Sequence, residues 1–272
     1  EAFDEYWRGK PKIKYAYIRQ IDPTLAVSKG DADFLCTYSI DVVNAAKQNG
    51  NYDILRASPT RLQVFRFFID TPPFNDVRFR RALIYAIDFK AIIERFYGGY
   101  AKQMSTFMIP GYWENKTLPP YEYDPEKAKK LVKESGYDGR ELELLYYYTD
   151  LTTPQIMTAI QYYWKQVGIN VKIRYVDAPT ATALVIGNLQ DQFRGKAILY
   201  AANAAIDPSF LEAFTTGHTW DFLKMNSSIY NELIRKGYET VDPATRKVYY
   251  DQAQAILYRE TAPIPLWAPD IL

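Results

Sequence analysis

The sequence has little of the chemistry on which most metal and cofactor sites depend. Its 272 residues include one cysteine, Cys36, and one histidine, His218. A single cysteine excludes an internal disulfide and any cysteine-rich zinc or iron–sulfur site. Cys36 lies in the apolar stretch DFLCTY, so we expect a buried, inert thiol, and we expect His218 to lie in a surface loop. We therefore predict no metal site and no cofactor.

The chain also has no excess of charge of one sign and no long apolar run. It carries 33 Lys and Arg against 32 Asp and Glu, a formal net charge of +1. Nucleic-acid binding normally needs a basic field that neutralises phosphates, so no nucleic-acid partner is expected. No apolar run approaches the roughly 18 residues of a membrane helix. The opening residues EAFDEYWRGK also lack the pattern of a signal peptide.

Catalytic patterns are equally scarce. The sequence contains no G-x-S-x-G nucleophile elbow and no glycine-rich phosphate loop. Carboxylate pairs such as Glu141 and Glu143 occur two residues apart, a spacing that is common on solvated surfaces. We predict no catalytic residue.

Aromatic residues, in contrast, are abundant. They make up 16% of the chain, with 24 Tyr, 14 Phe and 5 Trp. This is more than a core of this size needs, so we expect some rings to face a ligand or partner. Tyr146, Tyr147 and Tyr148 end one predicted strand, and Tyr200 ends another. Ligands often bind at the strand ends of α/β sheets, although core or rim positions for these tyrosines remain an alternative.

Helical and strand patterns alternate along the chain, which predicts an α/β architecture. Helices begin at capping residues such as Asp88 and Asp124, and Gly98-Gly99 and Gly136 end them. Residues 101–121 show little periodicity and are expected to form an ordered loop. A proline-rich extended tail is expected after residue 262. The expected strands are 13–18, 63–69, 141–147, 169–176 and 197–202.

One segment carries a specific resemblance. The run FFIDTPPFNDVRFRRALIYAID, residues 67–88, resembles a motif of the extracytoplasmic solute-binding proteins of family 5. These are the peptide, oligopeptide, nickel and oligosaccharide receptors of ABC importers. Other stretches resemble the family in order and spacing: YWRGKP at 6–11, DPEKA at 124–128, DPSFL at 207–211 and PIPL at 263–266.

The resemblance implies a periplasmic-binding-protein-like fold of type II, with two lobes that close over a ligand. Residues 1–60 would then form part of lobe I, residues 61–261 lobe II, and residues 262–272 a return segment to lobe I. Family members are about twice this length, so we expect a fragment, mostly of the second lobe.

The resemblance also implies a function. A monomeric, non-enzymatic receptor would capture a small oligomeric solute, an oligosaccharide or a peptide, and deliver it to the membrane permease of an ABC importer. The receptor would be periplasmic or extracellular. A membrane-associated lipoprotein is one form that it could take. The alternative is a hydrolase that acts on such oligomers, which would need a carboxylate pair or triad in the cleft.

The resemblance further points to ligand-binding residues. Peptide-binding members contact the terminal ammonium of the peptide with an acidic residue, and Asn203 stands at that position, with Tyr200 in place of a tryptophan. An amide cannot form that ion pair, which favours a neutral oligosaccharide, although Asn203 could equally be a turn residue without ligand contact. The expected ligand-facing wall consists of Tyr147, Tyr148, Tyr200, Asn203, Met108, Tyr112 and Trp113.

Replacing Tyr200 and Asn203 together by alanine in the intact receptor is expected to weaken ligand binding by about tenfold, because a stacking ring and a hydrogen-bonding amide are lost. Calorimetry measures this, and an unchanged affinity would contradict the predicted wall.

The 272-residue chain alone is expected to bind weakly, because the other lobe covers the ligand in the closed receptor. Tight binding by this chain would overturn the two-lobe interpretation.

Overall fold

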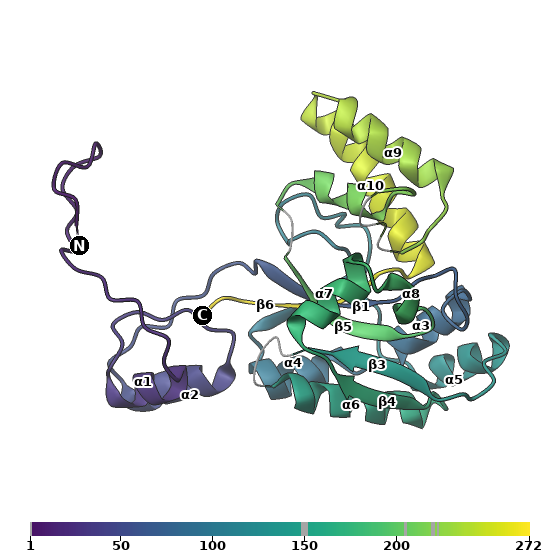
Figure 1. Ribbon diagram of the computed structural model, residues 1–272, viewed down its shortest axis with the longest axis horizontal. Coiled ribbons are helices and arrows are strands. Elements are labelled where there is room, and N and C mark those ends of the chain that lie inside the picture. The colour runs from purple at the N-terminus through teal and green to yellow at the C-terminus, as the bar shows by residue number, and fades with distance from the viewer. Residues whose placement is uncertain (1, 148–151, 204–205, 219–220, 222) are drawn as a thin grey trace. The chain divides into compact units, whose positions relative to one another are not determined.

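The computed structural model describes residues 2–147, 152–203, 206–218, 221 and 223–272 (Figure 1). The chain divides into two compact units. The smaller unit comprises Glu1–Leu35 with Asp41–Ile54, and the larger comprises Cys36–Ile40 with Leu55–Leu272.

The smaller unit contains helix α1 (Pro23–Lys29) and most of α2 (Ile40–Asn49). Asp22 caps α1, since its carboxylate accepts the Leu25 N–H at 2.8 Å, and Gly30 ends the helix with φ +74°. Val27 of α1 packs on three buried residues of α2, which are Val42, Ala45 and Ala46.

Two expectations for the first forty residues are wrong. Residues 13–18 do not form a strand: their backbone has no regular pairing, and Ile18 is 100% exposed. An alternating pattern gives a strand only where a partner strand supplies hydrogen bonds, and none among the described residues pairs with this segment. Cys36 is exposed rather than buried. Of its neighbours in DFLCTY, only Leu35 packs against a hydrophobic cluster, so this stretch does not enter a core.

The larger unit is built around one six-stranded mixed sheet of order β2-β6-β1-β5-β3-β4. Strand β3 is parallel to β4 and β5, whereas β1 is antiparallel to both β5 and β6, and β2 is antiparallel to β6. The strands are β1 (Arg61–Arg66), β2 (Ala101–Gln103), β3 (Leu142–Tyr146), β4 (Val171–Tyr175), β5 (Ala197–Asn203) and β6 (Ile264–Pro269). The predicted α/β class is confirmed, and four of the five expected strands are present within a few residues.

Strand β6 was expected only as an extended tail. It lies in the sheet between β1 and β2, and β2 itself occupies the start of the segment expected as a loop. Beyond β6, the Ile271 and Leu272 amides donate to the carbonyls of Ala57 and Thr37. The division of a whole receptor into lobes at residues 60 and 262 stays a prediction.

The register of β1 against β5 decides which side chains share a face of the sheet. Val64 lies opposite Tyr200, and Phe65 lies opposite Leu199. Residues that face each other in an antiparallel pair point to the same side, and successive residues alternate. Val64, Arg66 and Tyr200 therefore occupy one face, and Phe65 and Leu199 occupy the other.

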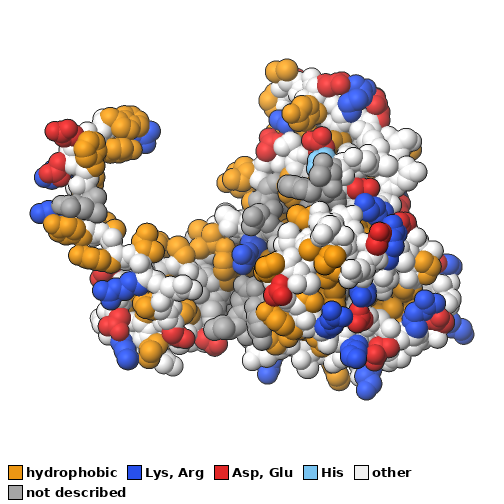
Figure 2. Space-filling model, in the orientation of Figure 1, with side chains coloured by type: hydrophobic (Ala, Val, Ile, Leu, Met, Phe, Trp, Pro, Cys, Tyr) orange, Lys and Arg blue, Asp and Glu red, His pale blue; other side chains and the backbone are white. Residues whose placement is uncertain are grey.

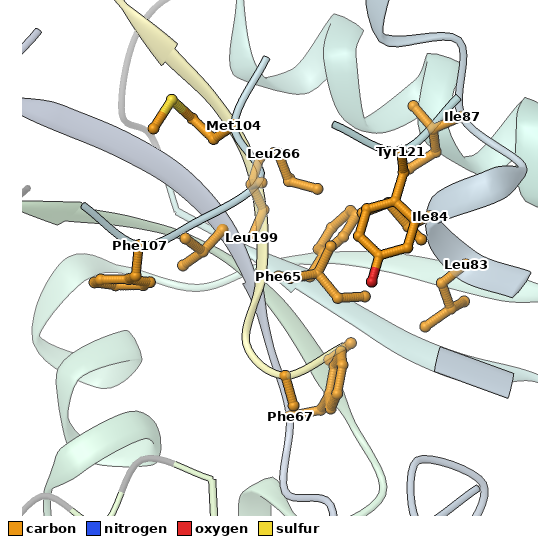
Figure 3. Packing of buried hydrophobic residues seen from close by; sticks show 14 of the residues in the cluster. Phe65, Phe67, Leu83, Ile84, Ile87, Met104, Phe107, Tyr121, Leu199 and Leu266 are labelled. Atoms are coloured by element: carbon orange, nitrogen blue, oxygen red, sulfur yellow. The ribbon is translucent and has the colours of Figure 1, made fainter. Parts of the chain in front are cut away.

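The face with Phe65 forms the main core (Figure 3). The Phe65 ring lies 5.0 Å from the ring of Trp164, which is 1% exposed. The Trp164 indole N–H donates to the Leu83 carbonyl at 2.9 Å, so a buried polar group is satisfied while two helices are joined. These are α6 (Thr153–Gln166) and α3 (Val77–Tyr85).

The opposite face is covered in part by α7 (Ala178–Ile186) and α8 (Gln190–Phe193). Val185 and Phe193 from these helices pack on Ile198 and Leu145 of the sheet. The remaining helices are α4 (Phe89–Tyr97), α5 (Pro125–Glu134), the 3₁₀ helix η1 (Pro208–Phe214), α9 (Ser228–Glu239) and α10 (Pro243–Glu260).

The surface agrees with the balanced composition. On the face drawn in Figure 2, Lys and Arg side chains are interspersed with Asp and Glu side chains over the larger unit. Many of them pair locally along helices, as Arg235 does with Glu232 at 2.7 Å and Lys129 with Glu126 at 2.7 Å. Such exposed pairs contribute little to stability, roughly 0.2–1 kcal/mol each.

Asp88 is predicted to stabilise the fold rather than to bind ligand. Its carboxylate accepts the Ala91 N–H at 2.9 Å and thereby caps α4. Asp88→Ala should lower the free energy of unfolding by about 1 kcal/mol, measured by urea denaturation. Asp88→Asn keeps a capping oxygen and serves as the control, with a smaller loss. Unchanged stability in Asp88→Ala combined with lost ligand binding in the intact receptor would contradict this assignment.

Candidate ligand-binding pocket

A pocket of about 190 Å³ opens on the sheet face that carries Val64, Arg66 and Tyr200. Strands β1 and β5 form its floor, the last residue of α7 forms one side, and η1 with the segment around Phe107 forms the other. Its lining residues are Val64, Arg66, Phe107, Ile186, Tyr200, Ala201, Ala202, Phe210, Phe214 and Pro263.

Three phenylalanines make the apolar wall. The Phe107 ring stacks on Phe210, with centroids 5.5 Å apart and planes inclined by 6°, and meets Phe214 edge-on at 5.1 Å. Phe107 and Phe214 are almost completely buried. Aromatic pairs of this geometry contribute about 0.5–1.5 kcal/mol each beyond area burial, so the wall is held in place before any ligand arrives.

Tyr147 and Tyr200, two of the residues predicted from the sequence, lie together beside this wall. Their rings are 5.6 Å apart, and both are half-buried. The Tyr147 hydroxyl accepts the Ala201 N–H at 3.1 Å and donates to the Ala201 carbonyl at 3.3 Å. Burial raises the pKa of Tyr147, so the phenol stays protonated at neutral pH. The hydroxyl thus ties the end of β3 to the backbone of β5.

The structure places the other predicted wall residues differently. Asn203 is the last residue of β5, with its backbone opposite Arg61, and Tyr148 lies outside the described residues. Met108 is 0% exposed within the main core, beneath the surface rather than in the pocket lining. Their contacts with a ligand stay predictions.

Tyr112 and Trp113 are likewise not among the lining residues. Tyr112 is 52% exposed. The Trp113 ring packs edge-on against Tyr250 of α10 at 6.2 Å, and the Arg246 guanidinium lies 5.3 Å from the Trp113 ring. Trp113 is therefore already engaged with α10.

The residue that sequence reasoning missed is Arg66. It is 3% exposed, and its Nη2 donates to the carbonyl of Val185 at 2.7 Å, in the last turn of α7. Burial lowers the pKa of Arg66 to about 9, while Tyr200 and Asp221 favour its charged form, so the guanidinium is protonated at neutral pH. A signal was present: Arg66 interrupts the apolar run of the strand QVFRFFI, on the same face as Val64.

Metal-binding clusters and membrane-spanning helices are both absent from the described residues. Within these ranges, no group of three or more His, Cys, Asp or Glu side chains is arranged to hold a metal ion. None of the described helices has the length and apolar character needed to cross a membrane.

The fold is that of the periplasmic binding proteins. The ABC transporter substrate-binding protein CtaP of Listeria monocytogenes superposes with a TM-score of 0.85 at 23% identity, covering 99% of this chain and 56% of that one. DppA of Helicobacter pylori, solved in complex with the peptide STSA, gives a TM-score of 0.77 at 22% identity over 91% of this chain and 49% of its own.

Sequence comparison gives the family. Residues 1–221 match the bacterial extracellular solute-binding proteins, family 5 Middle. The chain belongs to this family, which confirms the resemblance of the 67–88 motif.

Individual relatives in sequence are also named as binding proteins. Glutathione-binding protein GsiB of Escherichia coli (strain K12) is 27% identical over 286 residues, 98% of this chain and 54% of that protein. A putative ABC transporter peptide-binding protein of Brucella ovis is 29% identical over 202 residues, 71% of this chain and 38% of that protein. The chain thus spans about half the length of the glutathione-binding relatives that it matches, or less for the Brucella protein.

The Tyr147 hydroxyl is predicted to stabilise the pocket edge. Tyr147→Phe removes both hydrogen bonds to Ala201, and the free energy of unfolding should fall by about 1 kcal/mol, measured by urea denaturation. Tyr112→Phe provides the control, because Tyr112 is exposed and its hydroxyl loss should leave stability unchanged. Equal stability of the two variants would show that the Tyr147 contact adds nothing.

Proposed function

We propose that this chain is the ligand-binding part of a solute receptor for an ABC importer, which captures a peptide or a related oligomeric solute by closure of two lobes and delivers it to a membrane permease. The observation that carries this proposal is the aromatic pocket on the sheet of a family 5 chain. Its one lining tyrosine, Tyr200, and its three phenylalanines offer stacking and apolar area, as small-molecule sites commonly do.

Peptides are favoured over oligosaccharides as the solute. The relatives carry the names glutathione-binding and peptide-binding protein, and DppA was solved with a peptide. The pocket floor also carries a cation, Arg66, which a neutral sugar would not require. An oligosaccharide is the second candidate, because the rings of Tyr147 and Tyr200 and the amide of Asn203 would suit a hydroxylated ligand.

Capture without chemistry is favoured over hydrolysis. Hydrolysis of an oligomer by side chains alone would use a carboxylate pair or a nucleophile with its base. The described pocket-lining residues include neither. In this proposal the receptor acts as a monomer, without a cofactor, on the extracytoplasmic side of the membrane, free in the periplasm or outside the cell, or anchored as a lipoprotein.

A thermal-shift panel on the intact receptor tests the solute class. Short peptides should raise the melting temperature, because a ligand at 100 times its Kd adds about 2.7 kcal/mol to stability, whereas oligosaccharides should not. Tyr200→Ala should reduce the peptide shift, and Tyr238→Ala, at an exposed position of α9 outside the pocket lining, should not.

Two results would contradict the proposal. Stabilisation by oligosaccharides but not by peptides would reverse the solute class. Recovery of cleaved peptide from the receptor, detected by mass spectrometry, would replace capture by hydrolysis.

A further inference from the structure

We propose that the larger unit carries a second ligand site, which shares no lining residue with the aromatic pocket and binds a small organic anion with an apolar tail. Such a ligand joins a charged head, a phosphate or a carboxylate, to a short hydrocarbon chain. Lys224 and Arg259 contact the head, and the apolar side chains beside them contact the tail.

The site is a pocket of about 400 Å³ whose lining lies entirely within the larger unit. Three segments that are distant in sequence form it: Ile69 beyond the end of β1, residues 224–229 at the start of α9, and the last turns of α10. Small-molecule sites span about 300–1,000 Å³. The pocket is therefore large enough to hold a whole small molecule.

Part of the lining is apolar. Its apolar residues are Ile69, Met225, Ile229 and Ile256. Met225 and Ile256 are buried and belong to the main core, whereas Ile229 is 69% exposed. A hydrocarbon chain that packs on these side chains removes apolar surface from water on both sides of the contact, which favours binding.

The charged part of the lining favours an anion. The Arg259 guanidinium has no carboxylate partner among the described residues. Lys224 Nζ lies 3.6 Å from the Asp221 carboxylate, farther than a normal hydrogen bond. Glu260 is also in the lining, but its carboxylate is paired at 3.0 Å with Arg80, which is buried. An anionic head can therefore form charge-assisted hydrogen bonds with Arg259 and Lys224.

The backbone of Lys224 supports this role. Its φ is +55°, a left-handed conformation that is unfavourable for a residue with a Cβ. The turn is held by the Ile69 N–H, which donates to the Leu223 carbonyl at 2.9 Å, and by the Lys224 N–H, which donates to Asp221 Oδ1 at 3.2 Å. Glycine would adopt this conformation without strain, so a lysine here indicates that its side chain is used.

Calorimetry on the intact receptor tests the site with three probes: hexyl phosphate, methyl phosphate and hexanol. Hexyl phosphate should bind at least tenfold more tightly than either of the others, because it alone supplies both a charged head and a tail.

Variants assign the two parts of the ligand. Lys224→Gly removes the ammonium and suits the left-handed backbone, and Arg259→Gln removes the guanidinium at an exposed position. Each should weaken binding of hexyl phosphate about tenfold. Ile229→Ser should reduce the advantage of hexyl phosphate over methyl phosphate, since it shortens the apolar surface that the tail contacts.

Two controls separate the site from general charge and from the aromatic pocket. Arg174→Gln removes a cation of β4 that pairs with Glu143 at 3.5 Å and lies outside the lining. Tyr200→Ala alters the aromatic pocket alone. Both variants should bind hexyl phosphate as the unmodified receptor does.

A vesicle assay identifies the source of the ligand, because an anionic phospholipid presents the same head and tail chemistry. Sedimentation with phosphatidylglycerol vesicles but not with phosphatidylcholine vesicles, reversed by hexyl phosphate, would identify a membrane lipid. Binding of hexyl phosphate without sedimentation would identify a soluble amphiphile.

No binding of hexyl phosphate, or equal affinity for hexyl phosphate and hexanol, would overturn the inference. Full binding by a folded receptor that carries both Lys224→Gly and Arg259→Gln would also overturn it. None of these results would affect peptide capture, which depends on the other pocket.

Discussion

The antiparallel pairing of β1 with β5 on one side and β6 on the other is the constraint on which the rest of the larger unit depends. It places Phe65 against Trp164 in the main core and Arg66 on the pocket face. Because side chains alternate along a strand, a slip of one residue would exchange these faces. The guanidinium would then enter the core beside an indole, and a phenyl ring would replace it on the pocket floor. The hydrophobic core and the character of the pocket therefore depend on one register.

Much of the fold could be predicted because its signals are local. Helix starts at Asp88 and Asp124 depend on a carboxylate that accepts backbone amides within the next three residues, and both caps are present. Strand pairing is not local. Residues 13–18 have a strand pattern but no partner among the described residues, whereas the proline-rich segment 264–269 finds two partners and becomes β6. Sequence pattern indicates the capacity to pair, and the position of a distant segment decides whether pairing occurs.

The candidate site, like the fold, was predictable where its signals are local and not where they depend on distant segments. Tyr147 and Tyr200 come together because β3 and β5 are neighbouring strands. Tyr147 follows the end of β3, as expected, whereas Tyr200 lies in the middle of β5 and not at its end, because β5 continues to Asn203. Met108 and Trp113 belong to an aperiodic segment, and nothing in its sequence tells which ring is taken up by α10 and which side chain enters the core. Arg66 was missed for a different reason. A charge in a β-prone run is usually at the surface, and only the covering by α7 and the aromatic wall shows that this one is buried.

The pairing of β6 with β1 also has a consequence for biosynthesis. The two strands stand near opposite ends of the larger unit in sequence, with β2 to β5 and most of the helices between them. A chain that leaves the ribosome from its N-terminus therefore exposes one edge of β1 until residues 264–269 have emerged. Contacts between such distant segments form slowly, and an unpaired strand edge can pair with other chains. During synthesis the growing chain is thus most vulnerable to aggregation along the strand that later becomes the centre of its sheet.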